Sequence, residues 1–170
     1  MSTLKDVIFG DLERELAVTR KVLAAVPADK FDWKPHAKSM SLAKLAIHIA
    51  TLPDWMAHTL ALDVLDFATA PHPPQSVADT AALLALFDDR AGALRQAVAQ
   101  FDPAGWDAIW TMKSGTQVFT AKPRSWVFRV WDLNHMIHHR GQLCLYLRLL
   151  DVKVPTVYFN TADDPTFVFE

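Results

Sequence analysis

The sequence has little cysteine and no excess of charge of either sign. Its 170 residues include one cysteine, Cys144, so no disulfide can form within the chain. Leucines at 143 and 145 flank it, which favours a buried, inert thiol over a reactive one. The 17 lysine and arginine residues are balanced by 19 aspartate and glutamate residues, for a net charge of −2. With no basic stripe in the chain, neither nucleic acid nor an anionic membrane surface is expected as a partner.

Long apolar runs are also missing. No uninterrupted apolar stretch approaches the roughly 20 residues that span a bilayer. The N-terminal segment MSTLKDVIFGDLERELAV lacks the basic start and apolar run of a secretion signal, so a cytoplasmic protein is expected. A hydrophobic content of 51 % supports a sizeable core. We predict a single domain over residues 1–170, of which residues 151–170 form an irregular tail.

Four segments have the apolar periodicity of helices. The first is predicted at 4–26, and the second from about 41 to between 61 and 67. The third follows the cap residues Ser76 and Asp79 and ends near Phe101, and the fourth covers about 124–150. Two extended pieces, AIWTM and QVFTA, flank KSGT and predict a small β-hairpin before the last helix. We therefore predict an all-α fold, a four-helix bundle, in which facing helices place ligand and metal sites in the core.

Histidine is concentrated in one short stretch, NHMIHHRGQ, at positions 134–142. His135 and His139 are four residues apart, so on a helix both rings project from one face about one turn apart. Two imidazoles chelate a metal ion with this spacing, although a pair of hydrogen-bonded core histidines would show it too. His138 points about 100° away from His139 and is assigned to packing or to the surface.

A third histidine, His48, stands among apolar residues in AKLAIHIATL. A polar ring that faces a bundle core needs a partner, and one shared ion would satisfy all three imidazoles at once. We therefore predict His48, His135 and His139 as metal ligands. The remaining histidines are expected in solvent: His36, His58 and His72.

These motifs resemble the DinB family of bacterial four-helix metalloproteins. The resemblance covers FDWKPHAKSMSLAKLAIHIATLPDW near the start and NHMIHHRGQLCLYLRLLDVKVP near the end. It implies an up-down-down-up bundle, a divalent metal held by three histidines, and a homodimer. Carried over by position, the implied ligands are again His48, His135 and His139. After the valine–proline pair the family often continues with a glycine-containing loop, whereas this chain has TVYFNTADDP.

Three neutral imidazoles leave one to three coordination positions open, as in catalytic metal sites. Nitrogen ligands favour zinc or nickel by affinity, and iron or manganese would also fit. No glutamate stands between His135 and His139, so the general base of an HExxH zinc protease is absent and peptide hydrolysis is not expected. Several DinB proteins are thiol-dependent transferases or isomerases. The resemblance therefore implies an enzyme that activates a low-molecular-weight thiol for attack on a small electrophilic substrate.

Two other hypotheses stay open: a non-catalytic metal-binding or interaction module, and a plain bundle whose histidines are structural. Three residues near the paired histidines have assigned roles. Asp132 lies on their helix face and would either orient a ring or end in solvent. For Arg140 a surface salt bridge is favoured over contact with an anionic substrate, and for Gln142 helix packing is favoured over a role in orienting a metal ligand.

Overall fold

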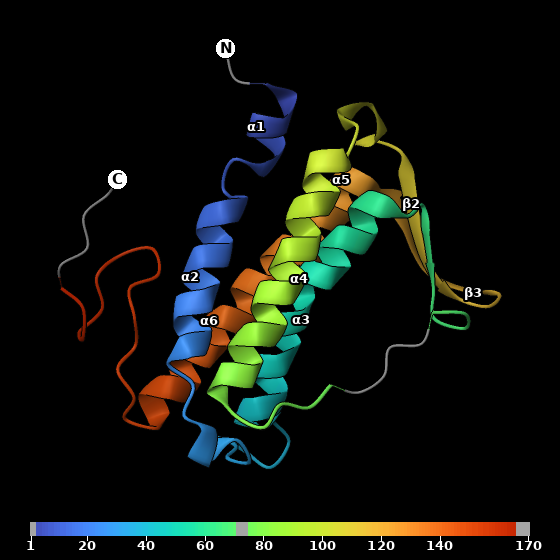
Figure 1. Ribbon diagram of the computed structural model, residues 1–170. Coiled ribbons are helices and arrows are strands. Elements are labelled where there is room, and N and C mark those ends of the chain that lie inside the picture. The colour runs from blue at the N-terminus through green and yellow to red at the C-terminus, as the bar shows by residue number, and fades with distance from the viewer. Residues whose placement is uncertain (1–2, 71–74, 166–170) are drawn as a thin grey trace.

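The computed structural model describes residues 3–70 and 75–165. Its elements are α1 (Leu4–Phe9), α2 (Leu12–Ala24), η1 (Ala28–Lys30), α3 (Leu42–Ala61), β1 (Val64–Asp66), α4 (Thr80–Gln100), η2 (Pro103–Gly105), β2 (Ile109–Ser114), β3 (Gln117–Pro123), α5 (Arg124–Trp126), η3 (Val127–Leu133) and α6 (Asn134–Leu149). Figure 1 shows the four long helices side by side, with the strands gathered at one edge of them. His72 and the last five residues of the predicted tail lie outside the described residues.

Local signals set the ends of the helices. Ser41 and Asp79 cap α3 and α4, because each side chain accepts a hydrogen bond from the backbone N–H three residues later. Helix α3 continues through Pro53. The first predicted helix is divided into α1 and α2 at Gly10, where the carbonyl oxygen of Asp6 lies 2.5 Å from the position that a Cβ atom would take. Only glycine permits this close approach.

The main core lies between the four long helices. Helix α3 packs on α4 and α6, and helix α2 packs on the same two neighbours. Their facing side chains are almost fully buried, among them Leu16, Leu23, Leu45, Ile49, Phe87, Leu94, Met136 and Leu143. This arrangement sets α3 directly beside α6, so the histidines of the two helices can meet.

A three-stranded mixed sheet accompanies the helices, so the predicted all-α, up-down-down-up class is wrong. Strands β2 and β3 form the expected antiparallel hairpin, but β1 adds a parallel strand to it, with Val64 opposite Thr111. Leu65 of β1 packs with Trp110 and Val127 in a second, smaller core. The three residues of β1 are too few to show the alternation of apolar and polar side chains that is typical of a strand. Its partner β2 is also remote in sequence, so no local pattern predicts β1.

The last helical segment is irregular in its first half. It runs from α5 through η3 into α6, and η3 is a π-helix in which Asn134 N–H donates to the carbonyl of Arg129, five residues earlier. Short π-helical turns within α-helices are frequent at functional sites. The π-helical segment leads directly into α6, which carries two of the predicted ligands.

The chain after α6 has no helix or strand as far as residue 165. Side chains fix it in place: Asp163 accepts from Arg148 at 2.5 Å, and Thr161 donates to the carbonyl of Val154 at 2.8 Å. In the described part of the chain, no helix is long and apolar enough to cross a membrane. The homodimer and the cytoplasmic location stay predictions.

Candidate metal centre

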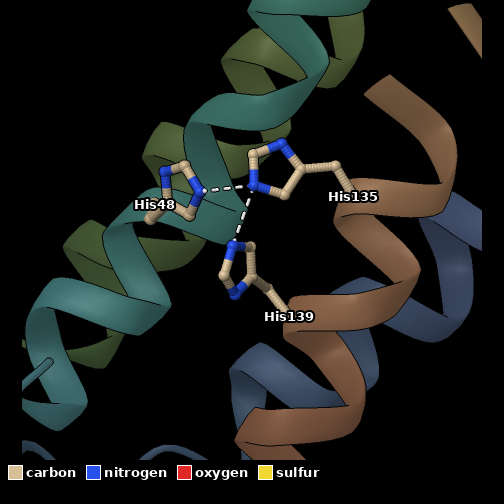
Figure 2. Close-up of side chains that lie close together, drawn as sticks. All are labelled: His48, His135 and His139. Carbon is tan, nitrogen blue, oxygen red and sulfur yellow. Dashed lines mark hydrogen bonds between the residues drawn. The ribbon is translucent and has the colours of Figure 1, made fainter. Parts of the chain in front are cut away.

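Three histidines converge between α3 and α6. Figure 2 shows His48 of α3 and the two rings of α6 pointing toward one another. His135 Nε2 lies 3.2 Å from His48 Nε2 and 2.8 Å from His139 Nε2. One nitrogen of each ring lies within 4.8 Å of the other two. Ligand atoms around a tetrahedral ion with bonds of 2.0–2.1 Å are about 3.3 Å apart, so the three rings fit a single ion.

A hydrogen bond at the outer nitrogen of His139 decides which of its ring atoms faces inward. His139 Nδ1 lies 2.7 Å from Gln142 Oε1. Gln142 Oε1 is an acceptor, so the His139 ring carries its proton on Nδ1 and leaves its Nε2 lone pair facing inward. That lone pair lies 2.8 Å from His135 Nε2, where it can accept a hydrogen bond from that ring or bind a cation that both rings share. Gln142 therefore orients a ring, and the packing role favoured from the sequence is wrong.

The environment keeps the rings of His48 and His135 neutral. Burial, followed by repulsion from His139 and His135, lowers the pKa of His48 to about 4. Burial and the neighbouring His139 also lower the pKa of His135, and they outweigh the hydrogen bond to Trp131, which raises it. Neutral imidazole is the form that coordinates a metal, so at pH 7 these two rings are in the form that binds one.

A pocket of about 870 Å³ opens beside His48, between α3, α4 and residues 75–77. Part of its wall is apolar, from Phe31, Ile47, Trp55 and Val77. Its polar lining includes Thr51, Asp54, His58 and Arg90. His58 is half-buried there, so the prediction that it lies in solvent is wrong, whereas His36 is exposed. The pocket gives a small molecule access to one of the three candidate ligands.

Asp132 follows neither of its predicted roles. It is 3 % exposed and lies beside Thr59 of α3, and its Oδ2 atom has no hydrogen-bond partner among the described residues. Burial raises the pKa of Asp132 to about 7 and outweighs the lowering by the Thr59 hydroxyl. Sequence reasoning placed Asp132 on the face of His135 and His139, but the π-helical turn carries it into the contact with α3.

Replacing Asp132 by asparagine is expected to stabilise the protein at alkaline pH. The pKa rises from 3.8 to about 7 on folding, so stability falls as the pH rises through this window and the carboxylate loses its proton. Asparagine carries no charge, and we expect it to raise the free energy of unfolding by about 1–3 kcal/mol at pH 8 and by little at pH 4. Urea denaturation at both pH values measures this, and an equal effect at both would rule out the buried charge as its cause.

Arg140 is buried, so the surface salt bridge favoured from the sequence is wrong. Its side chain is 1 % exposed and faces α2, where it lies 2.6 Å from Glu15 Oε2. It also donates to Thr19 Oγ1 at 3.0 Å and to the Tyr158 hydroxyl at 2.9 Å. Tyr158 in turn donates to Glu15 at 3.0 Å. This network joins α2, α6 and the C-terminal tail on a side of α6 that faces away from the pocket.

Comparison with known proteins agrees with this architecture. The family model described as the DinB family matches residues 1–166. A DinB-like protein from Bacillus cereus has 20 % identity and a TM-score of 0.69, covering 89 % of this chain and 95 % of its own. One from Bacillus subtilis has 18 % identity and a TM-score of 0.71, with 88 % and 96 % covered. One from Exiguobacterium sibiricum has 17 % identity and a TM-score of 0.62, with 92 % and 97 % covered.

These likenesses concern the fold, and no curated protein matches the chain. The family model, by contrast, spans nearly the whole sequence, including all three converging histidines. The chain therefore belongs to the DinB family.

Proposed function

We propose that His48, His135 and His139 hold a divalent metal ion, with zinc or nickel favoured by affinity, in a thiol-dependent transferase or isomerase that acts on small electrophiles. One observation carries the proposal. The Nε2 atom of His135 lies 2.8 Å from that of His139 and 3.2 Å from that of His48, and the hydrogen bond between His139 Nδ1 and Gln142 leaves the His139 Nε2 lone pair facing the other rings. Three imidazole nitrogens at these distances suit a single cation.

The donor set favours a reactive centre over a closed structural one. Within the described part of the chain, the group of converging ligands consists of three histidines with no fourth histidine, cysteine, aspartate or glutamate. Three protein ligands are typical of catalytic metal sites, which keep a position for substrate. When bound, a divalent cation would supply one chemistry that suits this site: it would lower the pKa of a coordinated thiol, so that the thiol loses its proton to solvent.

The residues of the chain would bind the substrate, orient the metal ligands and exclude water from the site. Gln142 fixes the tautomer of His139, and the apolar wall of the pocket holds the substrate beside His48. No carboxylate belongs to the group of ligands, so a general base for water is missing from it. A thiol that ionises on binding needs no such base, which favours thiol chemistry over hydrolysis.

Elemental analysis by mass spectrometry tests the metal, on protein purified without a metal-affinity column. We expect about one divalent ion per chain. The loaded protein is then assayed for conjugation of small thiols to a chromogenic aryl halide. Metal without any conjugation would favour the alternative, a non-catalytic metal-binding module. Protein that takes up neither zinc nor nickel would overturn the proposal.

A further inference from the structure

The pocket beside His48 ends at a pair of opposite charges. Arg90 of α4 and Asp54 of α3 line it together, with Arg90 Nε 3.3 Å from Asp54 Oδ2. This contact is poorly aligned, because Arg90 Nε is buried and donates no hydrogen bond to any described residue. About one third of each side chain is exposed, at 32 % and 30 %. Arg90 Nη1 also lies 3.6 Å from Asp89 Oδ2, which is too long for a hydrogen bond, and the Asp89 side chain is mostly exposed. The partly exposed guanidinium therefore keeps Nη donors for a ligand of the pocket that it lines.

Asp54, which pairs with Arg90, lies further along α3 than His48. It follows His48 by six residues, a rise of about 9 Å along the helix axis. Between the two positions the pocket wall includes Thr51, and the ring of Trp55 adds an apolar surface. A ligand with one end beside His48 would thus place an apolar body along α3 and its other end near Arg90.

We propose that this pocket binds an amphipathic organic anion, with the carboxylate of the ligand on Arg90 and its apolar body against Trp55 and Ile47. Planar guanidinium donors match a carboxylate, and such charge-assisted bonds are the strong ones. The proposal rests on the proposed function in one respect: the reacting thiol of the ligand lies at the end beside His48. It names the substrate class of that site, a thiol that carries a carboxylate at the opposite end of an apolar body.

Two charged residues near Arg90 allow the proposed carboxylate site to be tested. Asp54 competes with the ligand for the Arg90 guanidinium, so its removal strengthens anion binding. Lys44 also lines the pocket, but it precedes His48 by one helical turn and is exposed. Its ammonium group is screened by solvent and contributes little. Lys44→Gln is therefore a matched control for Arg90→Gln, because both remove one positive charge from the same pocket.

The test uses 6-mercaptohexanoate and the neutral 6-mercaptohexanol. The two thiols differ only in the group at the end opposite the thiol, which is a carboxylate in the first and a hydroxyl in the second. Each is titrated into the Co²⁺-loaded protein, and the visible spectrum of the ion reports binding. We expect wild type to bind the carboxylate at least about tenfold more tightly than the alcohol. Arg90→Gln loses this preference, Asp54→Asn increases it, and Lys44→Gln keeps it. The Co²⁺ content of each variant confirms that the centre is intact.

The outcomes separate this inference from the proposed function. If both thiols bind equally to wild type, or if Lys44→Gln loses the preference as fully as Arg90→Gln, the carboxylate site is wrong and the thiol proposal stands. If neither thiol changes the spectrum, the thiol proposal fails. Calorimetric titration with hexanoate then decides the carboxylate site alone: binding that Arg90→Gln weakens supports it, and no binding, or equal binding in both proteins, overturns it.

Discussion

Replacing Arg140 by leucine is expected to lower the free energy of unfolding by about 3–5 kcal/mol. The guanidinium is 1 % exposed and lies 2.6 Å from Glu15 Oε2, and the Glu15 side chain is 4 % exposed. Leucine would leave that buried carboxylate with only the longer contact to the partly exposed Arg14, at 3.4 Å, and the hydroxyls of Thr19 and Tyr158 would each lose a partner. Urea denaturation followed by circular dichroism measures the change as a lower midpoint at unchanged slope.

Two further variants isolate the buried charge. Arg95→Leu removes an ion pair that also reaches α2, at Glu13, but both side chains are at least half exposed, at 50 % and 65 %, so a loss below about 1 kcal/mol is expected. Combining Arg140→Leu with Glu15→Leu removes both charges and should recover much of the stability. If Arg140→Leu costs no more than Arg95→Leu, the network does not stabilise the fold.

The candidate ligands were predictable because their signals are local. A spacing of four residues puts His135 and His139 on one helix face, and the apolar neighbours of His48 turn its ring inward. The structure brings the three together within 4.8 Å. Gln142 was also within reach of sequence reasoning, since it follows His139 by three positions on the same helix face, but an amide at this spacing is equally common in packing.

Other features depend on contacts between distant segments. The residues around Arg140 do not reveal whether its guanidinium lies in solvent or against the buried Glu15, which is 125 positions away in the chain. Strand β1 exists because Val64 and its neighbours pair with β2, and the chain between 64 and 66 carries no pattern of its own. Asp132 was misplaced because an ideal helix was assumed where the chain forms a π-helix. Tertiary contacts decide each of these cases.

Replacing His135 by alanine is expected to lower metal affinity by well over 100-fold. Its Nε2 atom lies closest to both other rings, at 2.8 Å and 3.2 Å, so its loss leaves two imidazoles from different helices. Losing a residue that only orients a ligand already costs about 10–100-fold, and losing the ligand itself costs more. His48→Ala is expected to have the same result. Competition with a chromogenic chelator measures the affinity.

His138→Ala is the matched control, because His138 is a neighbouring histidine of α6 that is exposed and does not belong to the converging group. Its ring centroid lies 5.0 Å from that of His139, so the variant also tests whether proximity alone matters. Unchanged affinity in His138→Ala together with loss in the other two assigns the metal to the three-histidine group. Full metal occupancy in either His48→Ala or His135→Ala would show that the replaced residue is not a ligand. Equal loss of metal in all three variants would indicate that binding depends on the general structure of α6 and not on converging ring nitrogens.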